Sequence, residues 1–203
     1  MQQIEVFADV ACPFAHAGLR RFVSERTRRG VGVPTLRVRA WPLELVNEGP
    51  HSGAHLAGEV EALRAEVAPD LFRGFDPATF PRTTLPTLAA AAAANRASPE
   101  QGEAFSLAVR EALWEHGVDV ADEDVLLHLA QELDVPAPTA DDRAVVRADL
   151  AAGRSRGVDG SPHWFTASDD FFCPSLDITE TGGGMRVRFD QPAFDAFIAS
   201  AFD

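Results

Sequence analysis

The sequence predicts an α/β protein in which two β-rich segments, one near each end of the chain, are separated by a long helical segment. Three observations support this class. Residues 4–41 have the pattern of a strand, a helix and a strand; residues 47–157 carry apolar side chains at helical spacing; and residues 164–189 return to short β-prone runs. The 203 residues suffice for one sizeable core with one large insertion.

The first β-rich segment predicts one βαβ unit. Residues 4–10 are β-prone and apolar enough for a central strand. Cys12 follows at an expected helix N-cap, with Pro13 at the first helical position and a helix that runs to Gly30. Residues 36–41 alternate as a second strand, so the helix between the strands is expected to be a right-handed crossover.

The remaining elements follow from periodicity and capping signals. An apolar stripe over residues 56–67 predicts a helix, and further helices are expected to begin at Thr84, Ser98, Asp122 and Thr139. Residues 164–166 and 171–172 predict a hairpin, and residues 185–189 predict a further strand. Residues 192–202 predict an amphipathic terminal helix.

Composition excludes several classes of function. The formal net charge of −13 disfavours binding to nucleic acid or to an anionic membrane surface. The chain has no lysine and no tyrosine, which excludes a Schiff-base lysine and a catalytic tyrosine. No apolar run approaches membrane-spanning length and no secretory signal precedes Cys12, so a cytoplasmic location is expected.

Cys12 is the candidate nucleophile. A cysteine at a helix N-terminus meets the positive end of the helix dipole and unpaired amides, so its pKa is expected to be depressed. Dithiol enzymes place a resolving cysteine three residues later, but Ala15 occupies that position here. His16 could stabilise a thiolate or donate a proton; the alternative is a partly exposed histidine that packs on the helix.

Ser161 and Pro162 form the second candidate motif, just before the late strands. In thioredoxin-like folds a proline at this place follows a cis peptide bond, which turns backbone groups toward the reacting sulfur to pair with substrate. An ordinary turn is the alternative. Together with Cys12 this motif would form two halves of one site.

Residues 9–16 (Asp-Val-Ala-Cys-Pro-Phe-Ala-His) and 157–162 (Gly-Val-Asp-Gly-Ser-Pro) resemble the DsbA family, especially its FrnE-like and 2-hydroxychromene-2-carboxylate isomerase-like members. The resemblance implies a thioredoxin-like fold with a central four-stranded mixed sheet and a large α-helical insertion. It implies a discontinuous thioredoxin-like domain of residues 1–46 and 158–203, with residues 47–157 as the insertion domain.

The resemblance also implies the roles of the site residues. Cys12 would be catalytic and would be supported by its neighbours in the helix, and the motif before the late strands would bind substrate. The supporting residues are Pro13, Phe14, Ala15 and His16, and the substrate-binding residues are Ser161 and Pro162. Dithiol members have cysteine in place of Ala15. Kappa-class glutathione transferases and chromene isomerases have serine in place of Cys12, so this sequence falls between the two groups.

Three hypotheses of function follow. The leading one is a monothiol oxidoreductase, in which Cys12 attacks a disulfide and an external thiol releases the product. The second is a transferase or isomerase that binds a low-molecular-weight thiol, glutathione or mycothiol, and acts on a small hydrophobic compound. The third is a binding module that has lost catalysis. No metal or tightly bound cofactor is expected, and a homodimer is left open.

Other candidate residues are expected to be structural. Strand spacing of about 4.8 Å would place Cys173 too far from Cys12 for a resting disulfide. A buried structural role is therefore expected for Cys173, with a resolving thiol as the alternative. Core packing is expected for the three tryptophans rather than a pocket for an aromatic substrate, and the acidic group at residues 119–124 is expected to be a solvated helix start.

Overall fold

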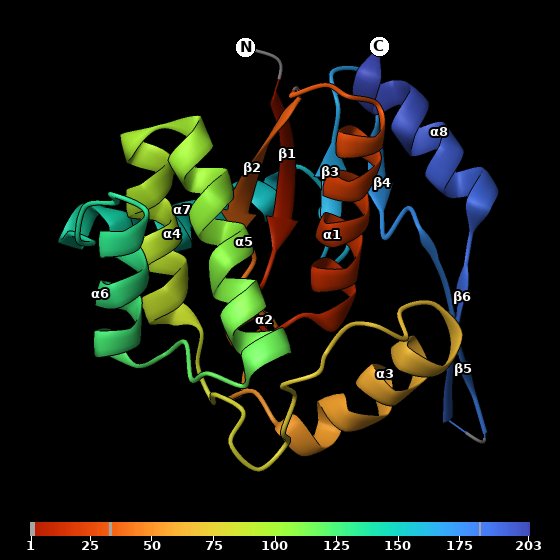
Figure 1. Cartoon of the computed structure of the whole chain (residues 1–203), viewed down its shortest axis with the longest axis horizontal. Coiled ribbons are helices and arrows are strands. Elements are labelled where there is room, and N and C mark those ends of the chain that lie inside the picture. The colour runs from red at the N-terminus through yellow and green to blue at the C-terminus, as the bar shows by residue number, and fades with distance from the viewer. Residues whose placement is uncertain (1–2, 33, 183) are drawn as a thin grey trace.

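The computed structural model of the chain describes residues 3–32, 34–182 and 184–203. Its centre is a four-stranded mixed sheet in the order β2-β1-β3-β4 (Figure 1). The strands are β1 (Gln3–Ala8), β2 (Thr35–Ala40), β3 (His163–Phe165) and β4 (Asp170–Phe172). β2 pairs with β1 in parallel, β3 pairs with β1 in antiparallel orientation, and β4 pairs with β3 in antiparallel orientation. The predicted α/β fold with a four-stranded mixed sheet is confirmed.

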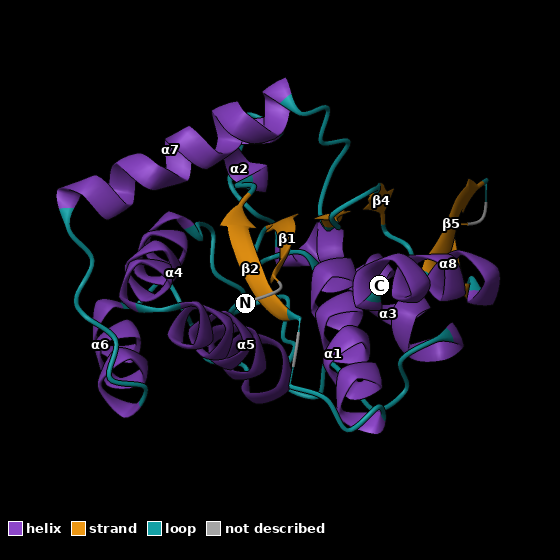
Figure 2. Ribbon diagram, turned by 90° about the horizontal axis from the view of Figure 1, so that it is seen from above, coloured by secondary structure: helices purple, strands orange, loops and turns teal. Residues whose placement is uncertain are grey.

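Helices cover both faces of this sheet. Figure 2 shows α7 on one face and α1 on the other, with the edges of the strands between them. The helices are α1 (Pro13–Arg28), α2 (Leu43–Val46), α3 (Gly53–Glu66), α4 (Leu85–Ala97), α5 (Pro99–His116), α6 (Glu123–Glu132), α7 (Ala140–Ser155) and α8 (Gln191–Phe202). None of the described helices is both long and apolar enough to cross a membrane.

The alternation of side chains along β1 explains this layering. Successive side chains of a strand point to opposite faces, so neighbours in β1 join different cores. Val6 belongs to a core with Phe22 of α1 and Phe197 of α8. Phe7 points the other way and packs with Leu150 of α7. β1 is therefore the buried central strand that its apolar sequence predicts.

A small second sheet lies outside the central one. The strands β5 (Leu176–Thr181) and β6 (Gly184–Phe189) form an antiparallel hairpin that packs beside α3 (Figure 1). The strand expected over residues 185–189 is confirmed, but its partner was not predicted. The alternating sequence Leu-Asp-Ile-Thr-Glu-Thr of β5 is the signal that could have revealed it.

Most helices of the helical segment begin at the residues that the capping signals predict. Ser98 caps α5, Asp122 caps α6, and Thr139 caps α7 in a capping box with Asp142. Thr84 occupies the N-cap position of α4, but its side chain does not make a capping hydrogen bond. Its hydroxyl instead donates to the buried Asp9 carboxylate at 2.7 Å, because a charged acceptor forms the stronger bond.

Helices α3 to α7 lie between β2 and β3 in the chain, as expected for the segment 47–157. Most of the buried apolar residues of these helices lie in one cluster, which also includes residues from outside the segment. One cluster of buried residues joins Leu88 and Phe105 of these helices to Ala17 of α1 and Val187 of β6. The division into residues 1–46 with 158–203 and residues 47–157 therefore stays a prediction.

Gly153 in α7 and Gly58 in α3 give a matched test of the packing of α7. A Cβ at Gly153 would lie 2.6 Å from the Trp41 ring, whereas a Cβ at Gly58 would meet nothing within 4 Å. We expect Gly153→Ala to lower the free energy of unfolding by about 2 kcal/mol through overpacking. Gly58→Ala should raise it by up to about 1 kcal/mol through helix propensity. Urea unfolding of both variants checks this, and an equal response would contradict the close contact between α7 and Trp41.

Candidate active site

Cys12 lies at the N-terminus of α1, as predicted. Its backbone is extended, with φ −87°, and its Sγ accepts a hydrogen bond from the Ala15 amide at 3.4 Å. The thiol donates to the carbonyl oxygen of Ser161 at 3.0 Å. The Ser161-Pro162 peptide is cis, as expected. The structure thus brings together two motifs that lie about 150 residues apart in the chain.

The expected depressed pKa of Cys12 is wrong. The residue is only 3% exposed, and burial raises the pKa of its thiol to about 12. The hydrogen bonds with Ser161 and Ala15 lower the pKa, but less than burial raises it, and the charges of Glu59 and Asp9 raise it further. In this conformation Cys12 is therefore a neutral thiol.

Asp9 fixes the loop that carries Cys12. Its carboxylate is fully buried and accepts hydrogen bonds from the Ala11 amide at 3.0 Å, the Leu43 amide at 2.6 Å and the Thr84 hydroxyl at 2.7 Å. Its own amide donates to Ser161 Oγ at 3.0 Å. One residue therefore links the cysteine loop to α2, to α4 and to the motif before β3.

Two side chains of helix α5 donate hydrogen bonds to the same loop. Arg110 is buried and donates through Nη2 to the Asp9 carbonyl oxygen at 3.1 Å, and Trp114 donates through Nε1 to the Val10 carbonyl oxygen at 3.0 Å. Burial lowers the pKa of Arg110 to about 10, so the guanidinium is charged at neutral pH. These bonds satisfy two loop carbonyls that would otherwise be buried without a partner.

His16 faces α5 and not the sulfur. It is 1% exposed, and its Nε2 lies 2.8 Å from Glu115 Oε1. Its ring also packs against Phe72 and Trp114. Burial lowers the pKa of His16, although the bond with Glu115 opposes this. The expectation of a partly exposed histidine that packs on the first helix is thus wrong, because the ring is buried against Phe72 and against Trp114 of α5.

The other predicted site residues are also buried or half-buried. Pro13 begins α1, and Ala15 is fully buried, so the position of the missing cysteine is inside the protein. Phe14 is half-buried and contacts two of the hydrophobic clusters. The Pro162 carbonyl oxygen accepts a hydrogen bond from the amide of Cys173 at 3.1 Å, which continues the β3–β4 ladder past its end.

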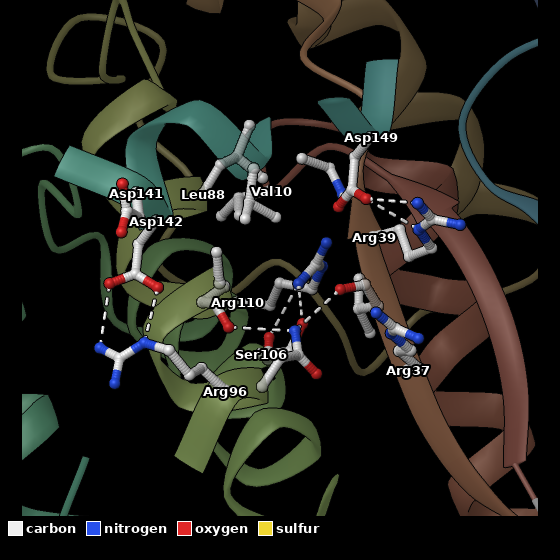
Figure 3. Close-up of a pocket in the computed structure, with 16 residues that line it drawn as sticks. Val10, Arg37, Arg39, Leu88, Arg96, Ser106, Arg110, Asp141, Asp142 and Asp149 are labelled. Carbon is white, nitrogen blue, oxygen red and sulfur yellow. Dashed lines mark hydrogen bonds and ion pairs between the residues drawn. The ribbon is translucent and has the colours of Figure 1, made fainter. Parts of the chain in front are cut away.

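A cavity of about 260 Å³ lies between β2 and helices α4, α5 and α7 (Figure 3). Two ion pairs lie in its lining, Arg96 with Asp142 and Arg39 with Asp149. Cys12 is not among the residues that line this cavity. The cavity is therefore separate from the sulfur.

The expected structural roles of two further groups are confirmed. The three tryptophans, Trp41, Trp114 and Trp164, are each no more than 4% exposed. In the acidic group, Asp122 accepts hydrogen bonds from two amides at the start of α6. Within the described residues, no cluster of histidine, cysteine and acidic side chains is placed to hold a metal ion.

A family model for the DSBA-like thioredoxin domain matches residues 3–180. The chain belongs to this family. The match confirms the thioredoxin-like fold that the two motifs implied. No curated protein is similar enough in sequence to match the chain.

Solved structures resemble this DSBA-like protein over most of its length. One is a 2-hydroxychromene-2-carboxylate isomerase, with a TM-score of 0.62 and 16% identity over 84% of this chain and 88% of that chain. Another is the cytosolic disulfide reductase DsbM from Pseudomonas aeruginosa with GSH, with a TM-score of 0.59 and 18% identity over 83% and 88%. A second structure of that reductase has a TM-score of 0.57 and covers 97% of both chains, at 18% identity. At these identities the likeness shows a shared fold.

Sequence reasoning missed the residues that hold the site of this DSBA-like protein in place. In the sequence alone Asp9 stands out only as part of a motif, and Arg110 and Glu115 do not stand out. Asp9 stands directly between an apolar strand and the cysteine loop, where a buried acid needs partners, and that position is a usable signal. Arg110 and Glu115 lie on one helix with ordinary spacing, and nothing local distinguishes them from surface charges.

We expect Asp9→Ala to lower the free energy of unfolding by about 3 kcal/mol, because two amides and a hydroxyl lose a charged acceptor in the interior. The control is Asp190→Ala, which removes only the capping bond to the Ala193 amide. That change should cost about 1 kcal/mol. Urea unfolding at pH 7 measures both, and similar losses would show that Asp9 does not organise the loop.

Glu115 should make the free energy of unfolding depend on pH in the acidic range. Burial alone would raise its pKa, but hydrogen bonds from His16 and from the amides of Phe72 and Arg73 outweigh burial and lower the pKa to about 2. Because the folded pKa lies below the ordinary value of 4.5, this contribution is present above pH 4.5 and disappears as the pH falls toward 2.

We therefore expect Glu115→Gln to cost about 2 kcal/mol at pH 7 and clearly less at pH 3. Glu111→Gln on the same helix removes a bond to Arg20 that is largely exposed, and should cost less than about 1 kcal/mol at either pH. Urea unfolding at the two pH values provides the comparison. A loss for Glu115→Gln that does not change with pH would contradict the role of the carboxylate.

Proposed function

We propose that this DSBA-like protein is a thiol-dependent oxidoreductase in which Cys12 is the attacking thiol. The observation that carries the proposal is the contact of Cys12 Sγ with the Ser161 carbonyl oxygen at 3.0 Å, at the N-terminus of α1. A helix N-terminus and the Ala15 amide favour negative charge on that sulfur. The backbone at residues 161–162, which leads into β3 beside the sulfur, offers a substrate disulfide groups with which to pair.

The first step is ordinary thiol–disulfide exchange. Cys12 loses its proton to solvent, and the thiolate attacks one sulfur of a disulfide to form a mixed disulfide, while the other half leaves as a thiolate and takes up a proton. The adjacent resolving position is Ala15, so an external thiol must return the protein to its reduced state. Glutathione and mycothiol are the candidates for this co-substrate.

The burial of Cys12 sets the pH dependence of this step. A thiol with a pKa of about 12 is almost entirely neutral at pH 7, and a disulfide must reach a sulfur that is 3% exposed. Helix α3 and the β5–β6 hairpin lie at the end of the molecule where α1 begins (Figure 1). They are the elements that would move aside for a substrate to enter.

The test is reaction of the reduced protein with glutathione disulfide. We expect a glutathione adduct on Cys12 whose rate of formation rises about tenfold per pH unit between pH 7 and pH 9, because the thiolate fraction rises in proportion. Added glutathione should remove the adduct. Mass spectrometry follows both steps, with Cys12→Ser as the control that gains no adduct at this position.

Two results would contradict the proposal. Failure of Cys12 to form an adduct at any pH at which the protein stays folded would leave the fold as a binding module without this chemistry. A rate that is flat above pH 7 would show that the thiol is already ionised, and the assigned hydrogen-bonded neutral state would be wrong.

A second function is favoured by the neutral state of Cys12. A thiol that donates a hydrogen bond can orient the sulfur of a bound low-molecular-weight thiol, as the serine at this position does in the resembling transferases and isomerases. Such a protein would act on a small hydrophobic compound without exchanging disulfides. Calorimetry with glutathione and with mycothiol separates the two functions when it is applied to Cys12→Ser. Under this second function the variant should still bind the thiol. Under the first function the variant should lose all disulfide exchange.

A further inference from the structure

The two cysteines of the chain point at the same atom. Cys12 Sγ lies 3.0 Å from the Ser161 carbonyl oxygen, and Cys173 Sγ lies 4.0 Å from the same oxygen. The separation of the two sulfurs cannot exceed the sum of these distances, so it is at most 7.0 Å. Both residues are free thiols and both are at least 95% buried.

The fold explains how residues from opposite ends of the chain meet. β3 lies between β1 and β4, and Ser161 and Pro162 stand directly before it. Cys12 follows β1 on one side of this segment, and Cys173 follows β4 on the other side. Strand spacing describes only the lateral separation of the backbones. The side chains instead lean inward from both sides toward the Ser161 carbonyl.

The backbone at Cys173 supports this orientation. Its φ is +44°, in the left-handed region that residues other than glycine seldom adopt. The amide is fixed by the Pro162 carbonyl oxygen at 3.1 Å, so the conformation is held by the ladder next to it. Burial raises the pKa of the Cys173 thiol well above its ordinary value, and the nearby ionisable thiol of Cys12 raises it further, as expected of neighbouring thiols.

We infer that Cys173 is the second thiol of this site and that it resolves the mixed disulfide formed on Cys12. This inference rests on the proposed function and supplies the resolving step that Ala15 cannot. Cys173 loses its proton, attacks Cys12 Sγ and forms a Cys12–Cys173 disulfide, while the second half of the substrate leaves as a thiolate that takes up a proton. One substrate disulfide is reduced to two thiols, and the two cysteines are oxidised.

Geometry and effective concentration favour this step over attack by an external thiol. The sulfurs must approach to about 2 Å, so the side chains must rotate away from the Ser161 carbonyl and toward each other. A thiol tethered within 7.0 Å competes with external thiols at an effective concentration in the millimolar range or above. External glutathione or mycothiol then reduces the internal disulfide and is itself oxidised.

The test follows the adduct that glutathione disulfide leaves on the protein. In the wild type we expect the Cys12 adduct to give way to an adduct-free protein that is lighter than the reduced form by two hydrogens. Peptide mapping without reductant should find Cys12 joined to Cys173. In Cys173→Ser the adduct should persist at least about tenfold longer. Cys12→Ser should form neither the adduct on residue 12 nor the cross-link.

The outcomes separate this inference from the function on which it rests. A wild-type adduct on Cys12 that persists as long as in Cys173→Ser overturns the inference and leaves the proposed function standing. A cross-link between two molecules, or a first adduct on Cys173, also overturns it. Absence of any adduct on Cys12 overturns both. If Cys173→Ser fails to fold, the wild-type peptide map decides alone, because it needs no variant.

Discussion

The buried carboxylate of Asp9 is the constraint on which the site depends. A charged group without solvent is stable only when hydrogen bonds replace its water, and Asp9 receives these bonds from the cysteine loop, from the start of α2 and from Thr84. Each donor belongs to a different part of the chain. The requirement to satisfy one anion therefore sets the position of the Cys12 loop relative to the sheet and to the helical segment.

The protonation state of the Cys12 sulfur depends on two opposing effects of different size, the helix N-terminus and burial. The helix N-terminus stabilises a negative charge by roughly 1 kcal/mol at an exposed site. Removing a charged group from water costs several kcal/mol unless strong partners compensate. The hydrogen bond from the Ala15 amide is long, at 3.4 Å, and Cys12 is 3% exposed, so burial prevails in this conformation. Access of solvent to the site would reverse the balance.

Much of the fold could be predicted because short local patterns in the sequence specify its strands and helices. The apolar run of β1, the alternation of β2 and the cap–proline pair at Cys12 and Pro13 each require one kind of structure, and each was found in its place. The burial of Cys12 could not be predicted in this way, because it arises from elements distant in the sequence. The same holds for Thr84, whose side chain meets an acceptor 75 residues away instead of its own helix.

The Ser161 carbonyl oxygen accepts from both thiols, and this has a consequence for hydration. A disulfide has no S–H group, so oxidation of the two sulfurs removes both of these donors at once. A buried carbonyl is seldom left without a donor, and water is the common replacement. Formation of the Cys12–Cys173 disulfide would thus favour entry of water beside β3, and redox state and local solvation would change together.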